Sequence, residues 1–142
     1  MIKICFVCLG NICRSPMAEF MMKEKLRRIG RSGEFLVESR ATSYEESGND
    51  MHDGAKAVLS EHNIPYGIHN STRLEKSDYD YFDYFICMDD NNIEDINDIF
   101  SDMTKVSKLL KRDISDPWYT GNFEETYRDL DEGINLLIDE FD

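Results

Sequence analysis

Cys8 and Arg14 are the residues of this sequence whose types and spacing most clearly indicate chemistry. A cysteine thiolate is a strong nucleophile, and an arginine guanidinium is a planar fork that can hold two phosphate oxygens. Ser15 and Pro16 follow directly, and Pro is tolerated at the first position of a helix. We therefore interpret residues 8–15, CLGNICRS, as a loop that binds a phosphate-like anion against a nucleophilic sulfur.

The backbone of this loop is expected to bind the anion as well. A loop that enters a helix points several N–H groups at one spot. Gly10 is expected to allow a tight curvature that a Cβ would obstruct, and the positive field favours the thiolate form of Cys8. The alternative interpretation is that Cys8 is only a small buried residue and that Arg14 is only a surface cation. The N–H groups expected to bind phosphate belong to Leu9, Gly10, Asn11, Ile12, Cys13 and Arg14.

Alternating strands and helices are expected to position the loop. Apolar runs predict strands at 2–8, 35–39 and 84–88, with a weaker one at 109–114. Apolar residues at helical spacing predict helices from Ser15 to Gly30 (with Ala18, Met22, Leu26 and Ile29), over 53–62, around 90–100 and over 123–141. This alternation is typical of an α/β domain with a parallel sheet, in which ligands bind beyond the carboxyl ends of the strands. Cys8, Ser39 and Asp89 all fall at strand ends.

The charge of the chain makes some classes of binding partner unlikely. The 142 residues contain 16 Lys or Arg and 29 Asp or Glu, so the net charge is −13. Such a surface repels nucleic acid and anionic lipid. The sequence has no long apolar stretch and no signal-peptide layout. We expect a soluble cytoplasmic protein.

The four cysteines are expected to be free thiols rather than disulfides. Cys5 and Cys8 have the C-x-x-C spacing of a metal site. No second pair and no suitably spaced His complete the four ligands that zinc usually requires. We predict no metal and no cofactor, because the loop and Arg14 already supply positive charge.

Residues 7–19, VCLGNICRSPMAE, closely resemble the signature of the low-molecular-weight protein tyrosine phosphatases. A second element of that family, DPWY, stands at 116–119, and weaker similarities lie at 41–43, His69 and 87–89. The resemblance spans essentially the whole chain. With the strand and helix pattern, it implies one domain over residues 1–142. The implied fold is a flavodoxin-like, doubly wound α/β/α sandwich around a mainly four-stranded parallel sheet.

The resemblance implies catalytic roles for three residues. Cys8 attacks the phosphate and becomes phosphocysteine, and Arg14 binds the phosphate oxygens. Asp116 protonates the leaving oxygen and later activates water. From composition alone, an ordinary surface carboxylate in an Asp-Pro turn would be the better interpretation of Asp116.

Supporting roles follow from the same resemblance. Ser15 is expected to donate to the Cys8 thiolate, although a helix N-cap is the alternative. Asn11 is expected to brace the loop with Ser39 and His69, and a lone His is more often structural than catalytic. Cys13 is expected to form a reversible disulfide with the nucleophile, or else to be a packing residue. The other cysteines, Cys5 and Cys87, are expected to be inert.

The resemblance also implies a substrate class. Trp118 and Tyr119 are expected to form the walls of a deep slot, unless they are ordinary core aromatics. A deep slot selects phosphotyrosine because phosphoserine is too short to reach Cys8. Residues 44–51 form an acidic rim that favours basic phosphopeptides, or else a solvated charge run. We expect phosphotyrosine proteins as substrates, inorganic phosphate or other oxyanions as product and inhibitors, and a monomer or weak dimer.

Three rival functions use the same kind of loop. Protein arginine phosphatases usually carry Thr where this chain has Ile12. Arsenate reductases need further cysteines on a mobile segment, and beyond Cys13 only Cys87 is left. A non-hydrolytic phosphate carrier or sensor has no need of an acid such as Asp116. The sequence therefore favours the phosphatase.

Overall fold

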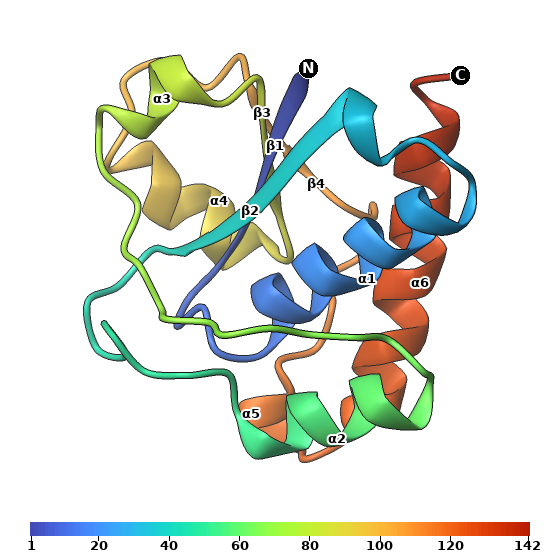
Figure 1. Cartoon of the computed structure of the whole chain (residues 1–142). Helices are drawn as coiled ribbons and strands as arrows, with labels where there is room; N and C mark the ends of the chain where they lie inside the picture. The colour runs from blue at the N-terminus through green and yellow to red at the C-terminus, as the bar shows by residue number, and fades with distance from the viewer.

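Four strands form one parallel sheet with the order β2-β1-β3-β4, and three of them lie where the sequence predicts (Figure 1). The computed structural model describes residues 1–142. The strands are β1 (Ile2–Cys8), β2 (Phe35–Ala41), β3 (Tyr84–Cys87) and β4 (Val106–Lys108). The α/β class and the four parallel strands predicted from the sequence are confirmed.

The predicted position of the fourth strand is wrong. Residues 109–114 form a loop, and β4 lies just before it. Leu110 and Ile114 are buried as apolar anchors of this loop, whereas the charged residues between them are exposed. The edge strand itself is short and only half buried, so it lacks the apolar run that marks the inner strands.

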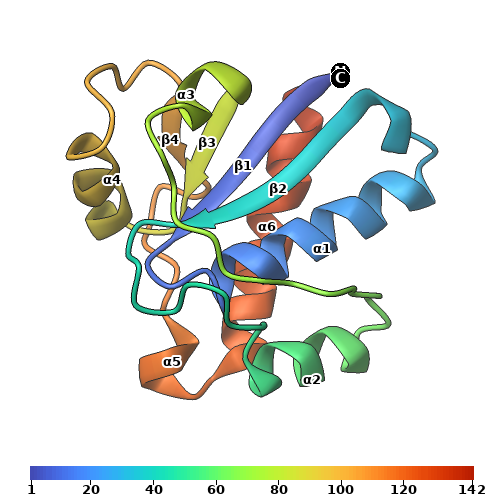
Figure 2. The same cartoon turned by 60° about the vertical axis from the view of Figure 1, so that its left-hand side comes forward.

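Helices cover both faces of the sheet, with α1 and α6 on one side and α4 on the other (Figure 2). The four-residue helices α3 and α5 were not predicted, because they are too short to show a period. The helices are α1 (Arg14–Arg28), α2 (Asp53–Glu61), α3 (Asp78–Tyr81), α4 (Asp90–Asn97), α5 (Pro117–Thr120) and α6 (Phe123–Asp139), with a 3-10 turn at Ser32–Glu34.

Two hydrophobic cores lie on the two sides of β1. Side chains alternate along a strand, so Ile4 and Phe6 enter the core beneath α1 and α6. Cys5 and Val7 enter the smaller core beneath α4. This double burial explains why residues 2–8 read as a continuous apolar run.

The first helix ends slightly earlier than its apolar spacing indicates. Ile29 is 55% exposed and does not join the core, because α1 ends at Arg28 and the chain turns away. Gly30 follows with a φ of +74°, a conformation that favours glycine. The helix therefore ends two residues before the predicted end at Gly30. The prediction that Ile29 faces the core is wrong.

The order of the strands creates a switch point at the carboxyl end of β1. The chain leaves β1 to build β2 on one side and later builds β3 on the other. The loops that leave β1 and β3 therefore diverge there and open a crevice. Both termini lie at the opposite end of the sheet (Figure 1). No helix has the length and apolar character needed to span a membrane.

Candidate active site

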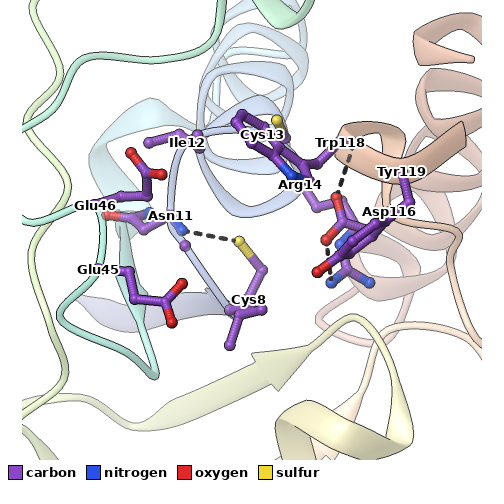
Figure 3. A pocket seen from close by; sticks show the side chains of 12 residues that line it. Cys8, Asn11, Ile12, Cys13, Arg14, Glu45, Glu46, Asp116, Trp118 and Tyr119 are labelled. Atoms are coloured by element: carbon purple, nitrogen blue, oxygen red, sulfur yellow. Dashed lines mark hydrogen bonds and ion pairs between the residues drawn. The ribbon is translucent and has the colours of Figure 1, made fainter. Parts of the chain in front are cut away.

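A pocket lies at this switch point, above the carboxyl end of β1 (Figure 3). Its floor is the loop 8–14, and its walls come from the segment after β2 and from α5 with the residue before it. The wall residues are Glu45, Glu46, Asp116, Trp118 and Tyr119. The structure therefore brings together the two motifs that are about a hundred residues apart in the sequence.

The Cys8 sulfur lies at the floor and is surrounded by donors. It is 3.0 Å from Ser15 Oγ, and it accepts from the N–H groups of Asn11 at 3.3 Å and Ser15 at 3.4 Å. Helix α1 begins at Arg14, with Cys13 at the N-cap position and no side-chain cap. Ser15 is therefore not the N-cap, and its hydroxyl lies where it can stabilise a thiolate.

The tight curvature of the loop depends on Asn11, not on Gly10 as predicted. Asn11 has a φ of +58°, a conformation that Asn adopts more readily than most residues. Gly10 has no positive φ, and a Cβ there would make only ordinary contact with Glu46, 3.4 Å from its Cγ. The N–H groups of Ile12, Cys13 and Arg14 donate to no atom of the protein. These free donors make the loop suited to an oxyanion.

A buried hydrogen-bond network holds Asn11 in this conformation. Its side-chain amide donates to Ser15 Oγ at 2.8 Å and to Ser39 Oγ at 2.9 Å. Ser39 in turn donates to Glu19 at 2.7 Å. His69 Nε2 lies 2.7 Å from the Asn11 carbonyl oxygen. The structure therefore brings Asn11, Ser39 and His69 together, as predicted, and adds Glu19.

Arg14 is buried between two carboxylates. It donates to Asp89 at 2.7 Å and to the Ile114 carbonyl at 2.7 Å, and it lies 3.5 Å from Asp116. Burial disfavours its charge, but the Cys8 charge and the Asp89 hydrogen bond outweigh burial and raise the pKa of Arg14. Asp89 received no role from the sequence, although its place two residues after the end of β3 was a signal.

Asp116 and the two aromatics stand at the entrance of the pocket. Asp116 caps α5 by accepting from the Trp118 N–H at 3.1 Å, and its other oxygen faces Arg14 (Figure 3). Trp118 is 56% exposed and Tyr119 is 76% exposed. Neither is a core residue, so the slot interpretation agrees with the geometry.

The remaining cysteines are all buried thiols. Burial, followed by the charge of Cys8, raises the pKa of Cys13, which lies in the loop. Cys87 ends β3, and burial raises its pKa to about 12. Cys5 lies in β1, and burial raises its pKa as well. A raised pKa favours the thiol form of these three cysteines, and a thiol is a weaker nucleophile than a thiolate.

Two further residues support the loop and were missed by the sequence analysis. Ser71 Oγ donates to the Gly10 carbonyl at 2.7 Å, and the Thr72 N–H donates to Asn11 Oδ1 at 3.1 Å. Both follow His69 closely, but nothing in their types distinguishes them from other loop residues. Only the return of this segment past the end of β2 brings them to the site.

The acidic rim consists of Glu45 and Glu46, which line the pocket. Glu46 accepts from the Asn49 side chain at 2.7 Å, whereas Glu45 is exposed and makes no ion pair. Asp50, the third acidic residue of this segment, pairs with Lys56 instead and does not line the pocket.

Comparison with known proteins gives one consistent result. The model of the family described as "Low molecular weight phosphotyrosine protein phosphatase" matches residues 3–142. Low molecular weight protein-tyrosine-phosphatase PtpA of Staphylococcus saprophyticus is 41% identical, over 97% of this chain and 92% of that protein.

Solved structures of known proteins are also similar to this chain. The low molecular weight protein tyrosine phosphatase SP-PTP of Streptococcus pyogenes has a TM-score of 0.91 at 41% identity, covering 99% of this chain and 93% of that one. YfkJ of Bacillus subtilis has a TM-score of 0.95 at 33% identity, covering 99% and 94%.

Proposed function

Because the chain belongs to the low molecular weight phosphotyrosine protein phosphatase family, we propose that it hydrolyses phosphotyrosine and aryl phosphates through a phosphocysteine on Cys8. One observation carries the proposal. The Cys8 sulfur lies beneath free loop N–H groups and beside the buried Arg14, so an oxyanion bound there meets a nucleophile. We propose that residues 1–142 act as a single phosphatase domain.

In the first step, the Cys8 thiolate attacks phosphorus and the bond to the tyrosine oxygen breaks. Arg14 and the loop N–H groups bind the phosphoryl oxygens and their charge in the transition state. Asp116 gives its proton to the departing phenolate oxygen. The Ser15 hydroxyl, 3.0 Å from the sulfur, stabilises the thiolate before attack.

In the second step, the Asp116 carboxylate removes a proton from water. The water oxygen attacks phosphorus, the phosphorus–sulfur bond breaks, and inorganic phosphate leaves. Asp116 is again protonated and Cys8 is again a thiolate, so the cycle is closed. Asn11, Ser39 and His69 keep the loop in shape throughout through their buried network.

Trp118 and Tyr119 form the walls that receive the tyrosine ring. Their exposed aromatic faces stand above the phosphate-binding loop, so a phosphate at Cys8 places its organic group between them and the rim. A phosphoserine side chain that enters between these walls is too short to bring its phosphate to Cys8. We propose that Cys13 protects an oxidised Cys8 by forming a disulfide with it.

The rival functions fit the site less well. Ile12 lines the pocket with a side chain that lacks the hydroxyl expected of an arginine phosphatase. Cys87 is a buried thiol inside β3, not the mobile cysteine that an arsenate reductase requires. Asp116 stands beside Arg14 at the entrance of the pocket. A phosphate carrier or sensor that does not hydrolyse phosphate has no need of an acid at this place.

The charge of the molecule supports a protein substrate. A net charge of −13 disfavours nucleic acid and anionic membranes as partners. We propose phosphotyrosine proteins as substrates and a monomer or weak dimer as the active form. The four free thiols and a thiolate mechanism support a reducing compartment, the cytoplasm.

The test is turnover of p-nitrophenyl phosphate and of a phosphotyrosine peptide by purified protein. We expect Cys8→Ser to abolish hydrolysis while vanadate and phosphate still bind, because the loop donors and Arg14 remain. Cys87→Ala, which removes a buried thiol outside the pocket, serves as the matched control and should retain activity. Measurable hydrolysis by Cys8→Ser would contradict the proposed nucleophile.

A further inference from the structure

His52, which lies outside the pocket, connects the phosphate-binding loop with the segment that carries the acid. It precedes α2, and its backbone N–H donates to the Ile12 carbonyl oxygen at 2.8 Å. Its side chain also caps α2, since Nδ1 accepts from the Gly54 N–H at 2.9 Å. These two contacts fix both the backbone and the ring of His52.

The His52 ring contacts two aromatic side chains from the acid's side of the site. It meets Trp118 edge-on, with centroids 5.7 Å apart and planes at 86°. It stacks on Phe123, the first residue of α6, with centroids 5.1 Å apart. A Cβ on Gly54 would lie 2.4 Å from the Phe123 ring, so this ring has no room to move toward α2. Figures 1 and 2 both show α5 beside the start of α2.

Few other contacts can hold Trp118. It belongs to a helix of only four residues, and its side chain is more exposed than buried. Its backbone N–H nevertheless donates to one oxygen of Asp116. The other Asp116 oxygen lies 3.5 Å from Arg14. A contact that fixes Trp118 therefore also orients the carboxylate that delivers the proton.

We propose that His52 is a positioning residue for the leaving-group side of the pocket. Its ring sets the place of Trp118, and Trp118 in turn sets the place of Asp116. This inference rests on the proposed phosphatase function. It requires that proton delivery by Asp116 depends on the ring of His52 and not on the hydrogen bond by which Nδ1 of His52 caps α2.

Two variants separate the ring from the cap. His52→Asn keeps a capping acceptor and removes the ring, whereas His52→Phe keeps a ring and removes the acceptor. We expect His52→Asn to lower kcat/KM for phenyl phosphate by about two- to tenfold, the effect of one aromatic contact. The loss should be smaller for p-nitrophenyl phosphate, whose leaving group needs little protonation. His52→Phe should recover most of the phenyl phosphate rate but melt at a lower temperature.

Three further measurements exclude a general structural effect. Inhibition by inorganic phosphate should be unchanged in His52→Asn, because the contact with Ile12 is made by the backbone. In a Trp118→Ala background, His52→Asn should cause no further loss. His62→Asn is the matched control, since it removes a ring stacked on Tyr127 at the opposite end of α2. It should leave both rates unchanged.

Several outcomes would overturn the inference. They are equal losses on both substrates, a further loss without Trp118, weaker phosphate inhibition, failure of His52→Phe to recover activity, or wild-type rates in His52→Asn. A wild-type protein that hydrolyses neither substrate would instead overturn the proposed function. The two failures are therefore distinguishable.

Discussion

Arg14 stands at the centre of the charges in the pocket. Its guanidinium is buried, and an unpaired buried charge would be strongly destabilising. Asp89 supplies the partner at 2.7 Å, while Asp116 remains slightly farther away at 3.5 Å. In this division, Asp89 holds the guanidinium in place, and Asp116 is left available for the proton transfer that we propose.

Asp116→Asn tests that division at the level of one side chain. The amide cannot donate the proton that a phenolate needs, so we expect kcat for phenyl phosphate to fall by about 10²- to 10⁴-fold. The loss for p-nitrophenyl phosphate should be much smaller, because its leaving group is stable as an anion. Steady-state rates on both substrates provide the measurement, and equal losses would remove Asp116 from the role of acid.

At the scale of elements, the segment between β2 and α2 places two negative charges on the rim of a pocket for an anion. Glu45 and Glu46 face the same opening as Cys8 (Figure 3). A substrate that carries Lys or Arg beside the phosphotyrosine would offset this repulsion. An acidic peptide would add to it.

The double variant Glu45→Gln with Glu46→Gln tests the rim. We expect kcat/KM for a basic phosphotyrosine peptide to fall by about two- to thirtyfold, because two exposed ion pairs contribute about 0.2–1 kcal/mol each. The value for an acidic peptide should rise. Glu61→Gln, an exposed change at the end of α2, is the control. An unchanged ratio between the peptides would indicate that the rim is merely solvated.

A second element-level feature is the close approach of α6 to the loop after β4. A Cβ on Gly133 would lie 2.4 Å from Leu109 Cγ. We expect Gly133→Ala to lower the free energy of unfolding by about 1–3 kcal/mol through overpacking, as read by urea denaturation. Gly33→Ala, where a Cβ meets nothing within 4 Å, is the matched control. Equal stability of the two variants would contradict the tight packing of α6.

At the scale of the whole molecule, the fold concentrates positively charged and N–H groups of the chain itself at the switch point. The loop N–H groups, the start of α1 and Arg14 all face one spot. We propose that they provide the electrostatic stabilisation that a metal supplies in other phosphatases.

We accordingly expect full turnover after dialysis against EDTA and in the presence of excess chelator. Hydrolysis of p-nitrophenyl phosphate before and after treatment is the measurement, with a metal-dependent phosphatase treated in parallel as the control. Loss of activity that returns on adding a divalent cation would show that the loop and Arg14 do not suffice.

The sequence by itself determined the class of fold and the loop with Cys8 and Arg14, whereas the role proposed for Asp116 came from the resemblance to a known family. Strand and helix periods are local properties, and a Cys-x5-Arg loop is read within a few residues. Only the tertiary structure revealed the contacts of Asp89 with Arg14, of Glu19 with Ser39 and of His52 with Trp118. These residues act through contacts between segments far apart in the chain, and no local pattern distinguishes a carboxylate or ring that will meet such a partner. The edge strand β4 was misplaced for a related reason, since its half-exposed side chains carry little apolar signal.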